Sequence, residues 1–267
     1  MNDMNEEKKM TGSISVEAEN IFPVIKKWLY SDKEIFLREI VSNACDAVTK
    51  MRRLASLGER EAEEGETFRV DVVLDRNERT LTVSDNGIGM TREEVERYIC
   101  SIALSGAMEF MEKYEKESAG NGIIGHFGLG FYSAFMVSSK VEVRTRSYKG
   151  GETTLWVCGE DGAYTYEETP ERASGTDVIM HIKADTDEEI YGSYLEVWKL
   201  KALIKKYSDY VRWPIVMDIT RQEQQETGET DKDGKPVMQN VTVTAPETVN
   251  SMIPIWQRSK TDVSDED

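Results

Sequence analysis

Four polar residues follow helical spacing in the stretch "SDKEIFLREIVSNACDAVTKMRR", which runs from Ser31 to Arg53. They are Glu39, Asn43, Asp46 and Lys50. Intervals of four, three and four residues place all of these side chains on one stripe of a helix. Asn and Asp are poor residues for a helix interior. The stripe is therefore either a solvated face, which is what a polar stripe alone typically means, or an active site laid along a helix.

A second candidate group lies where a strand ends. Thr80 to Ser84 alternates like a strand, and Asp85 continues the face that carries Leu81 and Val83. We therefore expect the Asp85 carboxylate at the mouth of the core. The following residues, "NGIGMT", include Gly87, Gly89 and Met90. Asp-Asn-Gly taken alone is also typical of an ordinary turn.

The third feature is a glycine-rich segment, "SAGNGIIGHFGLGF", which leads into an apolar helical stretch near Phe131. Its glycines are Gly120, Gly122, Gly125, Gly128 and Gly130. Free backbone N–H groups and a helix N-terminus both favour anions. The spacing matches neither the dinucleotide pattern G-x-G-x-x-G nor a P-loop, because no G-K-[ST] is present. Such a cluster alone is also typical of a flexible loop.

Together the three features indicate a nucleotide hydrolase. An Asn carbonyl suits Mg²⁺, a hard cation that keeps several waters and takes substrate phosphates. A Glu one helical turn away can orient or deprotonate an attacking water. A buried Asp can accept a hydrogen bond from an exocyclic amine such as that of adenine.

The chain between these features predicts an α+β arrangement. Ser31 with Glu34, and Thr91 with Glu94, form capping boxes that should begin helices, the second ending near Ile102. Further helices are expected at 107–116 and 195–211, and strands at 68–74, 80–84 and 214–220. Four strands at 140–147, 153–158, 163–168 and 176–182 are separated by short turns and predict an antiparallel meander. The tryptophans Trp156, Trp198 and Trp213 are expected in the core.

Composition narrows the function. The 267 residues carry a formal charge of -17, which disfavours non-specific binding to nucleic acid or anionic membrane. The charged N-terminus, "MNDMNEEKKM", does not resemble a signal peptide, and no apolar run is long enough for a membrane span. Three widely spaced cysteines and two histidines indicate a reducing compartment and no zinc site. We therefore expect a cytoplasmic protein that binds neither nucleic acid nor membrane.

Four segments resemble the N-terminal domain of the heat-shock protein 90 chaperones, nearest to the bacterial type: "REIVSNACDAVTK", "SDNGIGMT", "GHFGLGFYSAFMVSSKVEV" and "SGTDVIMHI". The wider superfamily includes DNA gyrase B, MutL and sensor histidine kinases. The resemblance implies a two-layer α/β sandwich, in which helices cover one face of a mostly antiparallel mixed sheet (the Bergerat ATP-binding fold). It implies a tail at 1–12, an ATP-binding domain at 13–220 with a mobile lid at about 101–130, a charged linker or long exposed hairpin at 221–250, and the start of a truncated middle domain at 251–267.

The resemblance also implies residue roles. Glu39 would be the general base for the water that attacks the γ-phosphate, and Asn43 would hold Mg²⁺ and the phosphates of ATP or ADP. Asp85 would accept a hydrogen bond from the adenine amino group, with Thr176 nearby through water. The remaining nucleotide-binding positions would be Asp46, Lys50, Gly89, Met90, Gly128, Gly130 and Phe131. Lys50 equally fits a surface lysine paired with Asp46 at i, i+4.

The chain departs from the family pattern before the lid, where "ICSIALSGA" stands in place of "LGTIAKSGT". The departures are Tyr98, Cys100, Leu104 and, further on, His126. They fall on the phosphate side, and the adenine side is intact. In the family, a middle-domain arginine completes the hydrolytic site and a C-terminal domain forms a homodimer, so a fragment of this kind should hydrolyse ATP slowly or not at all. The partners would be client proteins.

Two other functions remain open from the residues: a DNA-linked ATPase or kinase of the same superfamily, and a binding or scaffold module that has lost hydrolysis. The acidic charge opposes DNA binding. Glu39 argues against a pure binding module, because binding alone needs no group that activates water.

Overall fold

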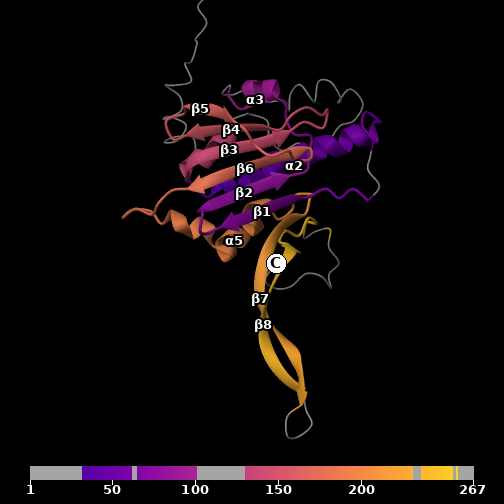
Figure 1. Cartoon of the computed structure of the whole chain (residues 1–267), viewed down its shortest axis with the longest axis vertical. Helices are drawn as coiled ribbons and strands as arrows, with labels where there is room; N and C mark the ends of the chain where they lie inside the picture. The colour runs from indigo at the N-terminus through magenta and orange to yellow at the C-terminus, as the bar shows by residue number, and fades with distance from the viewer. Residues whose placement is uncertain (1–31, 62–64, 101–129, 231–235, 255–256, 258–267) are drawn as a thin grey trace, which may run out of the picture.

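An eight-stranded sheet backed by helices forms the body of the molecule in the computed structural model, which describes residues 32–61, 65–100, 130–230, 236–254 and 257 (Figure 1). The strand order is β5-β4-β3-β6-β2-β1-β7-β8. The elements are α2 (Ile35–Ser56), β1 (Val70–Asp75), β2 (Thr80–Asp85), α3 (Arg92–Tyr98), the 3₁₀ helix η1 (Gly130–Met136), β3 (Ser138–Arg146), β4 (Thr154–Gly159), β5 (Tyr164–Glu167), β6 (Gly175–Ile182), the 3₁₀ helix η2 (Tyr191–Leu195), α5 (Val197–Ser208), β7 (Ile215–Thr230) and β8 (Pro236–Thr248). All strand pairs are antiparallel except β1 with β7, which confirms the mostly antiparallel mixed sheet.

The core lies between α2 and the inner face of the sheet. Along α2, apolar residues recur every three or four positions and are buried: Phe36, Leu37, Ile40, Val41, Ala44, Val48 and Met51. Alternate residues of the central strands meet them: Val70, Val72, Leu81, Val83, Val141, Val143 and Met180. The polar stripe of α2 lies beside this apolar face and so stays close to the sheet.

Helix α2 begins later than its sequence signal indicates. Its N-cap is Glu34, which makes no side-chain capping bond, so the predicted capping box with Ser31 is wrong in its placement; Ser31 itself lies outside the described residues. The Asp32 carboxylate instead accepts a hydrogen bond from the Glu34 N–H at 2.9 Å. Glu34 uses its carboxylate to pair with Lys199 and Lys206, which ties α2 to α5. The Glu34 carboxylate, which a local capping box would use, is therefore engaged in long-range ion pairs instead.

The second capping box is confirmed. Thr91 Oγ1 accepts from the Glu94 N–H at 3.3 Å, and the Glu94 carboxylate accepts from the Thr91 N–H at 2.9 Å. Helix α3 ends at Tyr98, four residues before the predicted end. The helix predicted at 107–116 lies outside the described residues. None of the helices in the described ranges combines the length and apolar character needed to cross a membrane.

The apolar stretch after the glycine-rich segment is helical, as predicted, since Gly130–Met136 forms a 3₁₀ helix in which Phe131 to Met136 are buried. The prediction of a four-stranded meander is wrong in part. The meander holds only for β3, β4 and β5, because β6 pairs with β3 and β2 instead of β5. Turn signals show that a strand follows, but they do not show which edge it will join. Strand β6 thereby closes the gap between the two halves of the sheet and places Thr176 opposite Asp85.

The segment predicted as a linker or exposed hairpin is a hairpin. Strands β7 and β8 pair from Val216 with Thr248 outward, and the ribbon projects from the body (Figure 1). Trp156 and Trp213 are buried, but Trp198 is 66% exposed, so the core prediction is wrong for that residue. Helix α5 buries Leu200, Leu203 and Ile204 instead.

The contrast between Phe135 and Trp198 gives a stability prediction. Phe135 is completely buried under α2, so Phe135→Ala should lower the free energy of unfolding by about 3–5 kcal/mol. Trp198→Ala, which removes a larger but exposed ring, should change it by less than about 1 kcal/mol. Urea unfolding followed by circular dichroism measures both. Equal losses for the two variants would contradict this assignment of the core.

Candidate functional site

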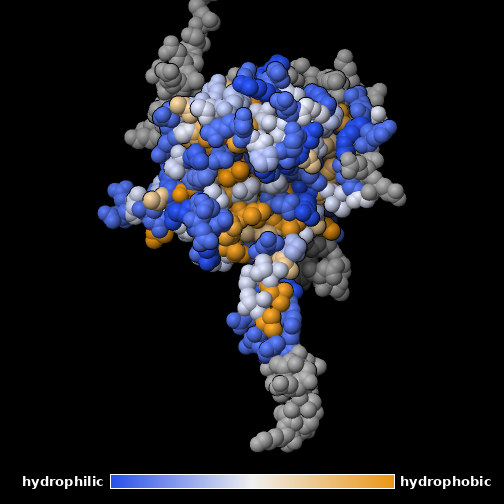
Figure 2. Space-filling model, in the orientation of Figure 1, coloured by the Kyte–Doolittle hydropathy of each residue, from blue (hydrophilic) through white to orange (hydrophobic). Residues whose placement is uncertain are grey.

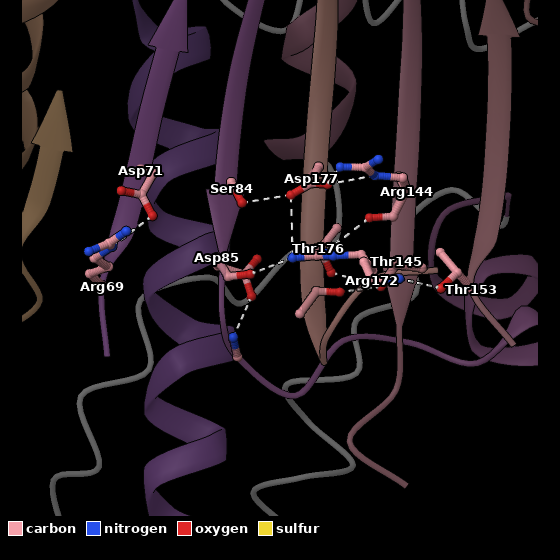
Figure 3. A network of polar contacts seen from close by, with 12 residues as sticks. Arg69, Asp71, Ser84, Asp85, Arg144, Thr145, Thr153, Arg172, Thr176 and Asp177 are labelled. Carbon is pink, nitrogen blue, oxygen red and sulfur yellow. Dashed lines mark hydrogen bonds and ion pairs between the residues drawn. The ribbon is translucent and has the colours of Figure 1, made fainter. Parts of the chain in front are cut away.

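Asp85 ends β2 as a buried carboxylate. The alternation of the strand turns it to the same face as Leu81 and Val83, and it is 6% exposed. Its Oδ1 accepts the Gly87 N–H at 2.8 Å, and it also accepts the backbone N–H of Thr176 (Figure 3). Burial nevertheless raises the pKa of Asp85 to about 7. The sequence prediction of a carboxylate at the mouth of the core is confirmed.

The loop after Asp85 lies directly on α2. The Ile88 N–H donates to the main-chain oxygen of Ala47 at 3.2 Å. A Cβ atom on Gly87 would stand 2.4 Å from the Ala47 carbonyl carbon, so only glycine fits. Ala47 is one helical turn beyond Asn43 and next to Asp46 in the chain. The strand end and the polar stripe of α2 therefore meet at one place.

The pKa of Cys45 also indicates that α2 and the end of β2 lie close together. The pKa of the buried Cys45 thiol is raised by burial and further by the negative charges of Asp46 and Asp85. Asp46 is 5% exposed, whereas Asn43 is exposed. Burial lowers the pKa of Lys50, and the charges of Asp46 and Glu94 oppose that change. Lys50 is thus half-buried between α2 and α3, and is not a freely solvated surface lysine.

Gly89, Met90 and Thr176 lie around the end of β2 that carries Asp85. Gly89 has a φ of 56°, and a Cβ atom there would stand 1.8 Å from the Arg146 carbonyl oxygen. The Met90 N–H donates to Thr145 Oγ1 at 3.0 Å, and the Thr145 and Thr176 hydroxyls are 2.9 Å apart. Thr145 is a residue that the sequence analysis missed. Its only sequence signal is a threonine in a strand otherwise rich in charged and branched residues.

Glu39 lies at the other end of the stripe, where η1 begins. A Cβ atom on Gly130 would stand 2.5 Å from Glu39 Oε2, so the carboxylate rests against this glycine. Arg38 Nε donates to the other oxygen, Glu39 Oε1, at 3.0 Å. Phe131 follows Gly130 and is buried. Gly130, the first residue of η1, and the candidate base Glu39 are therefore in contact.

The described residues offer few oxygen ligands, which suits a metal ion that is held mainly by a bound nucleotide. Within the described part of the chain, no group of three or more His, Cys, Asp or Glu side chains could hold a metal ion. The exposed Asn43 carboxamide, which lies one helical turn from Glu39, offers a single hard oxygen. This fits Mg²⁺ that is held mostly by phosphates and water. Gly128, Leu104 and His126 lie outside the described residues.

A surface hollow of about 200 Å³ lies away from this site, beside the start of α2. It is lined by Lys33, Glu189, Ile190, Tyr191 and Tyr194. Lys33 and Glu189 already form an ion pair there. Their charges satisfy each other, so the candidate site remains the one around Asp85.

The fold and this geometry are those expected of the ATPase superfamily: a helix stripe meets a strand-end Asp at one end and Gly130 at the other. The chain matches the family model described as histidine kinase-, DNA gyrase B- and HSP90-like ATPase over residues 30–182, and it belongs to that family. Within it, the similarity is to HtpG chaperones, which confirms the resemblance to the N-terminal ATPase domain of the heat-shock protein 90 group.

Three relatives illustrate that similarity. The chain is 47% identical over 257 residues to chaperone protein HtpG of Porphyromonas gingivalis and 45% identical over 257 residues to that of Bacteroides fragilis, covering 96% of this chain in each case. It is 39% identical over 251 residues, or 94% of this chain, to HtpG of Bacillus licheniformis. The matched region covers 35%, 34% and 39% of these relatives respectively, so the chain spans about a third of their length.

Substitution of Gly89 separates two costs: the strain of a left-handed backbone and the steric clash of a Cβ atom with the Arg146 carbonyl. Gly89→Ala introduces a left-handed alanine and forces a methyl group onto the Arg146 carbonyl. Gly150→Ala is the control, because Gly150 has a φ of 87° but nothing within 4 Å of its added Cβ. We expect the control to lose about 1–2 kcal/mol of unfolding free energy in urea, and Gly89→Ala to lose clearly more. Equal losses would show that the loop moves aside freely.

Proposed function

We propose that this chain is the ATP-binding and ATP-hydrolysing domain of an HtpG-type molecular chaperone. The observation that carries the proposal is the contact of the Asp85 loop with α2 at Ala47, which brings a buried carboxylate to the Asn43 stripe. Membership of the ATPase family supports the same conclusion. A DNA-linked ATPase is disfavoured by the formal charge of -17.

The adenine side of the site consists of Asp85, Gly89, Met90 and Thr176. Ionised Asp85 accepts a hydrogen bond from the 6-amino group of adenine, and Thr176 supports it through water. Gly89 lets the backbone approach Arg146 closely, which leaves the Met90 side chain to line the base pocket. A buried charged hydrogen bond of this kind distinguishes an amino group from a carbonyl.

The phosphate side consists of the α2 stripe and the entrance to η1. Asn43 holds the phosphates and Mg²⁺, which neutralises the developing charge when it is bound. Asp46 and Lys50 border the pocket, while Gly128, Gly130 and the Phe131 N–H face the phosphates. Glu39 orients and deprotonates the attacking water. The contact of Glu39 with Gly130 supports this arrangement, because it fixes the base beside the phosphate-binding backbone.

In the longer protein, nucleotide binding would close the lid at 101–130 and couple hydrolysis to the folding of client proteins. We propose a cytoplasmic homodimer assembled through regions beyond this chain, with middle-domain residues at 251–267 onward completing the site. Hydrolysis by this chain alone is then slow or absent, even though nucleotide binds. Stress response is the corresponding cellular role.

Asp85→Asn tests the adenine contact. The amide presents a donor to a donor, so ADP affinity should fall by about 10- to 150-fold, the equivalent of 1.5–3 kcal/mol. Isothermal titration calorimetry measures the affinity, and Asp71→Asn on neighbouring β1 is the control because Asp71 pairs with Arg69 on another face. Unchanged ADP affinity in Asp85→Asn would remove this residue from the site.

The pKa of Asp85 predicts pH-dependent binding. The free protein holds a proton on Asp85 up to about pH 7, whereas adenine requires the ionised form, so binding releases a proton. ADP affinity should fall about tenfold from its plateau by pH 6, since one pH unit below the pKa only about a tenth of the carboxylate is ionised. Titrations with excess Mg²⁺, which keeps the ADP phosphates ionised, measure this. Affinity that stays flat from pH 6 to 8.5 would contradict it.

Glu39→Ala and Gly130→Ala test the base. Both should lower ATP turnover by at least about 100-fold, the first by removing the base and the second by displacing it, and Glu39→Ala should keep nucleotide affinity within about twofold. Phosphate release from a protein extended to the full length of the relatives is the readout, with Glu142→Ala on the open sheet face as the control. Turnover like that of the unmodified protein in Glu39→Ala would exclude Glu39 as the base.

A further inference from the structure

Arg172, in the segment before β6, lies directly behind the adenine-binding carboxylate (Figure 3). Its side chain is only 12% exposed. One guanidinium nitrogen, Nη2, donates to the main-chain oxygen of Asp85 at 3.1 Å, and the other, Nη1, donates to the main-chain oxygen of Arg144 at 3.2 Å. The Arg172 N–H also donates to Thr153 Oγ1 at 3.1 Å. Arg172 is therefore held by hydrogen bonds to three segments of the sheet, and it touches the Asp85 backbone while acting on the Asp85 carboxylate through its charge.

Arg172 shares a buried counter-ion with Arg144. Asp177 lies 3.3 Å from Arg172 Nη2 and accepts Arg144 Nε at 2.8 Å and Ser84 Oγ at 2.6 Å. Its side chain is 7% exposed. Two arginines and one aspartate leave one positive charge, and only ionised Asp85 makes the four-residue cluster neutral. The cluster thus favours a negative Asp85.

We propose that Arg172 is a positioning residue that keeps Asp85 in its ionised, hydrogen-bond-accepting form and so sets selectivity for 6-amino over 6-oxo purine nucleotides. The proposal deepens the proposed function and rests on nucleotide binding at Asp85. A protonated Asp85 would donate a hydrogen bond and could serve the 6-carbonyl of inosine, whereas an ionised one cannot. Arg172 therefore affects selectivity without touching the base.

The charges around Asp85 support this role. Burial raises its pKa, the charge of Arg172 lowers it, and the charge of Asp177 raises it. On α2, the Cys45 thiol lies near Asp85 and Asp46, and burial together with their charges raises its pKa well above its usual range, so the thiol stays neutral. Among the described groups that act on Asp85, Arg172 is the cation. Its removal should consequently leave Asp85 protonated at neutral pH.

The test is calorimetric titration of ADP and inosine diphosphate, with excess Mg²⁺, from pH 6 to 9 in Arg172→Gln. We expect the pH midpoint of ADP affinity to rise by about one unit, as loss of a nearby opposite charge implies. ADP affinity would then be about fivefold lower at pH 7 but within about twofold of the unmodified chain at pH 9. The affinity ratio of inosine diphosphate to ADP should rise at pH 7.

Three variants keep the test decisive. Arg172→Lys, which retains the charge, should restore the midpoint, and Arg69→Gln, an arginine paired on β1, should leave it unchanged. Asp177→Asn should shift the midpoint in the opposite direction, and this result decides the matter if Arg172→Gln does not fold. An ADP affinity lowered equally at every pH, or an unmoved Asp177→Asn midpoint, would overturn the proposal. Absence of ADP binding by the unmodified chain would instead overturn the proposed function.

Discussion

The structure depends on the close approach of the Asp85 loop to the backbone of α2. At Gly87 the loop lies so near Ala47 that no side chain fits, and the Ile88 N–H closes the contact with a hydrogen bond. Without it, the polar stripe of α2 and the end of β2 would be two separate surface features. With it, the buried carboxylate at the end of β2 lies against the turn of α2 that follows Asn43. The helix tolerates unfavourable Asn and Asp residues because its opposite face is anchored by a continuous apolar core.

The ionised form of Asp85, which nucleotide binding requires, is the form that folding disfavours. A carboxyl group whose pKa is raised on folding stabilises the protein below its unfolded pKa of about 3.8, and that contribution is lost as pH rises through about 7. As pH rises through about 7, Asp85 therefore gains a charge that folding alone does not favour. A ligand that donates a hydrogen bond to this charge recovers part of the cost, so nucleotide binding and folding stability are linked through the same group.

Local patterns in the sequence predicted most of the described helices and strands and the buried position of Asp85. Alternation placed Asp85 beside Leu81 and Val83, and the Thr91 capping box marked α3. Features that depend on long-range pairing could not be predicted in this way. The insertion of β6 between β3 and β2 brings Thr145 and Arg172 to Asp85, and no local signal encodes it. Trp198 is exposed for the same reason, because the partner of α5 decides which face is buried.

Strand β6 also explains how the open face of the sheet can influence the site on its inner face. Successive side chains of a strand point to opposite faces, so Thr176 lies beside Asp85 while Asp177 enters the outer cluster with Ser84 and Arg144 (Figure 3). That outer face carries no covering helix among the described residues and mixes hydrophilic with hydrophobic side chains (Figures 1 and 2). Arg172 contacts the Asp85 main-chain oxygen and the Asp177 carboxylate of that outer cluster. Charges on the open face of the sheet therefore act on the pKa of a carboxylate that lies on its inner face.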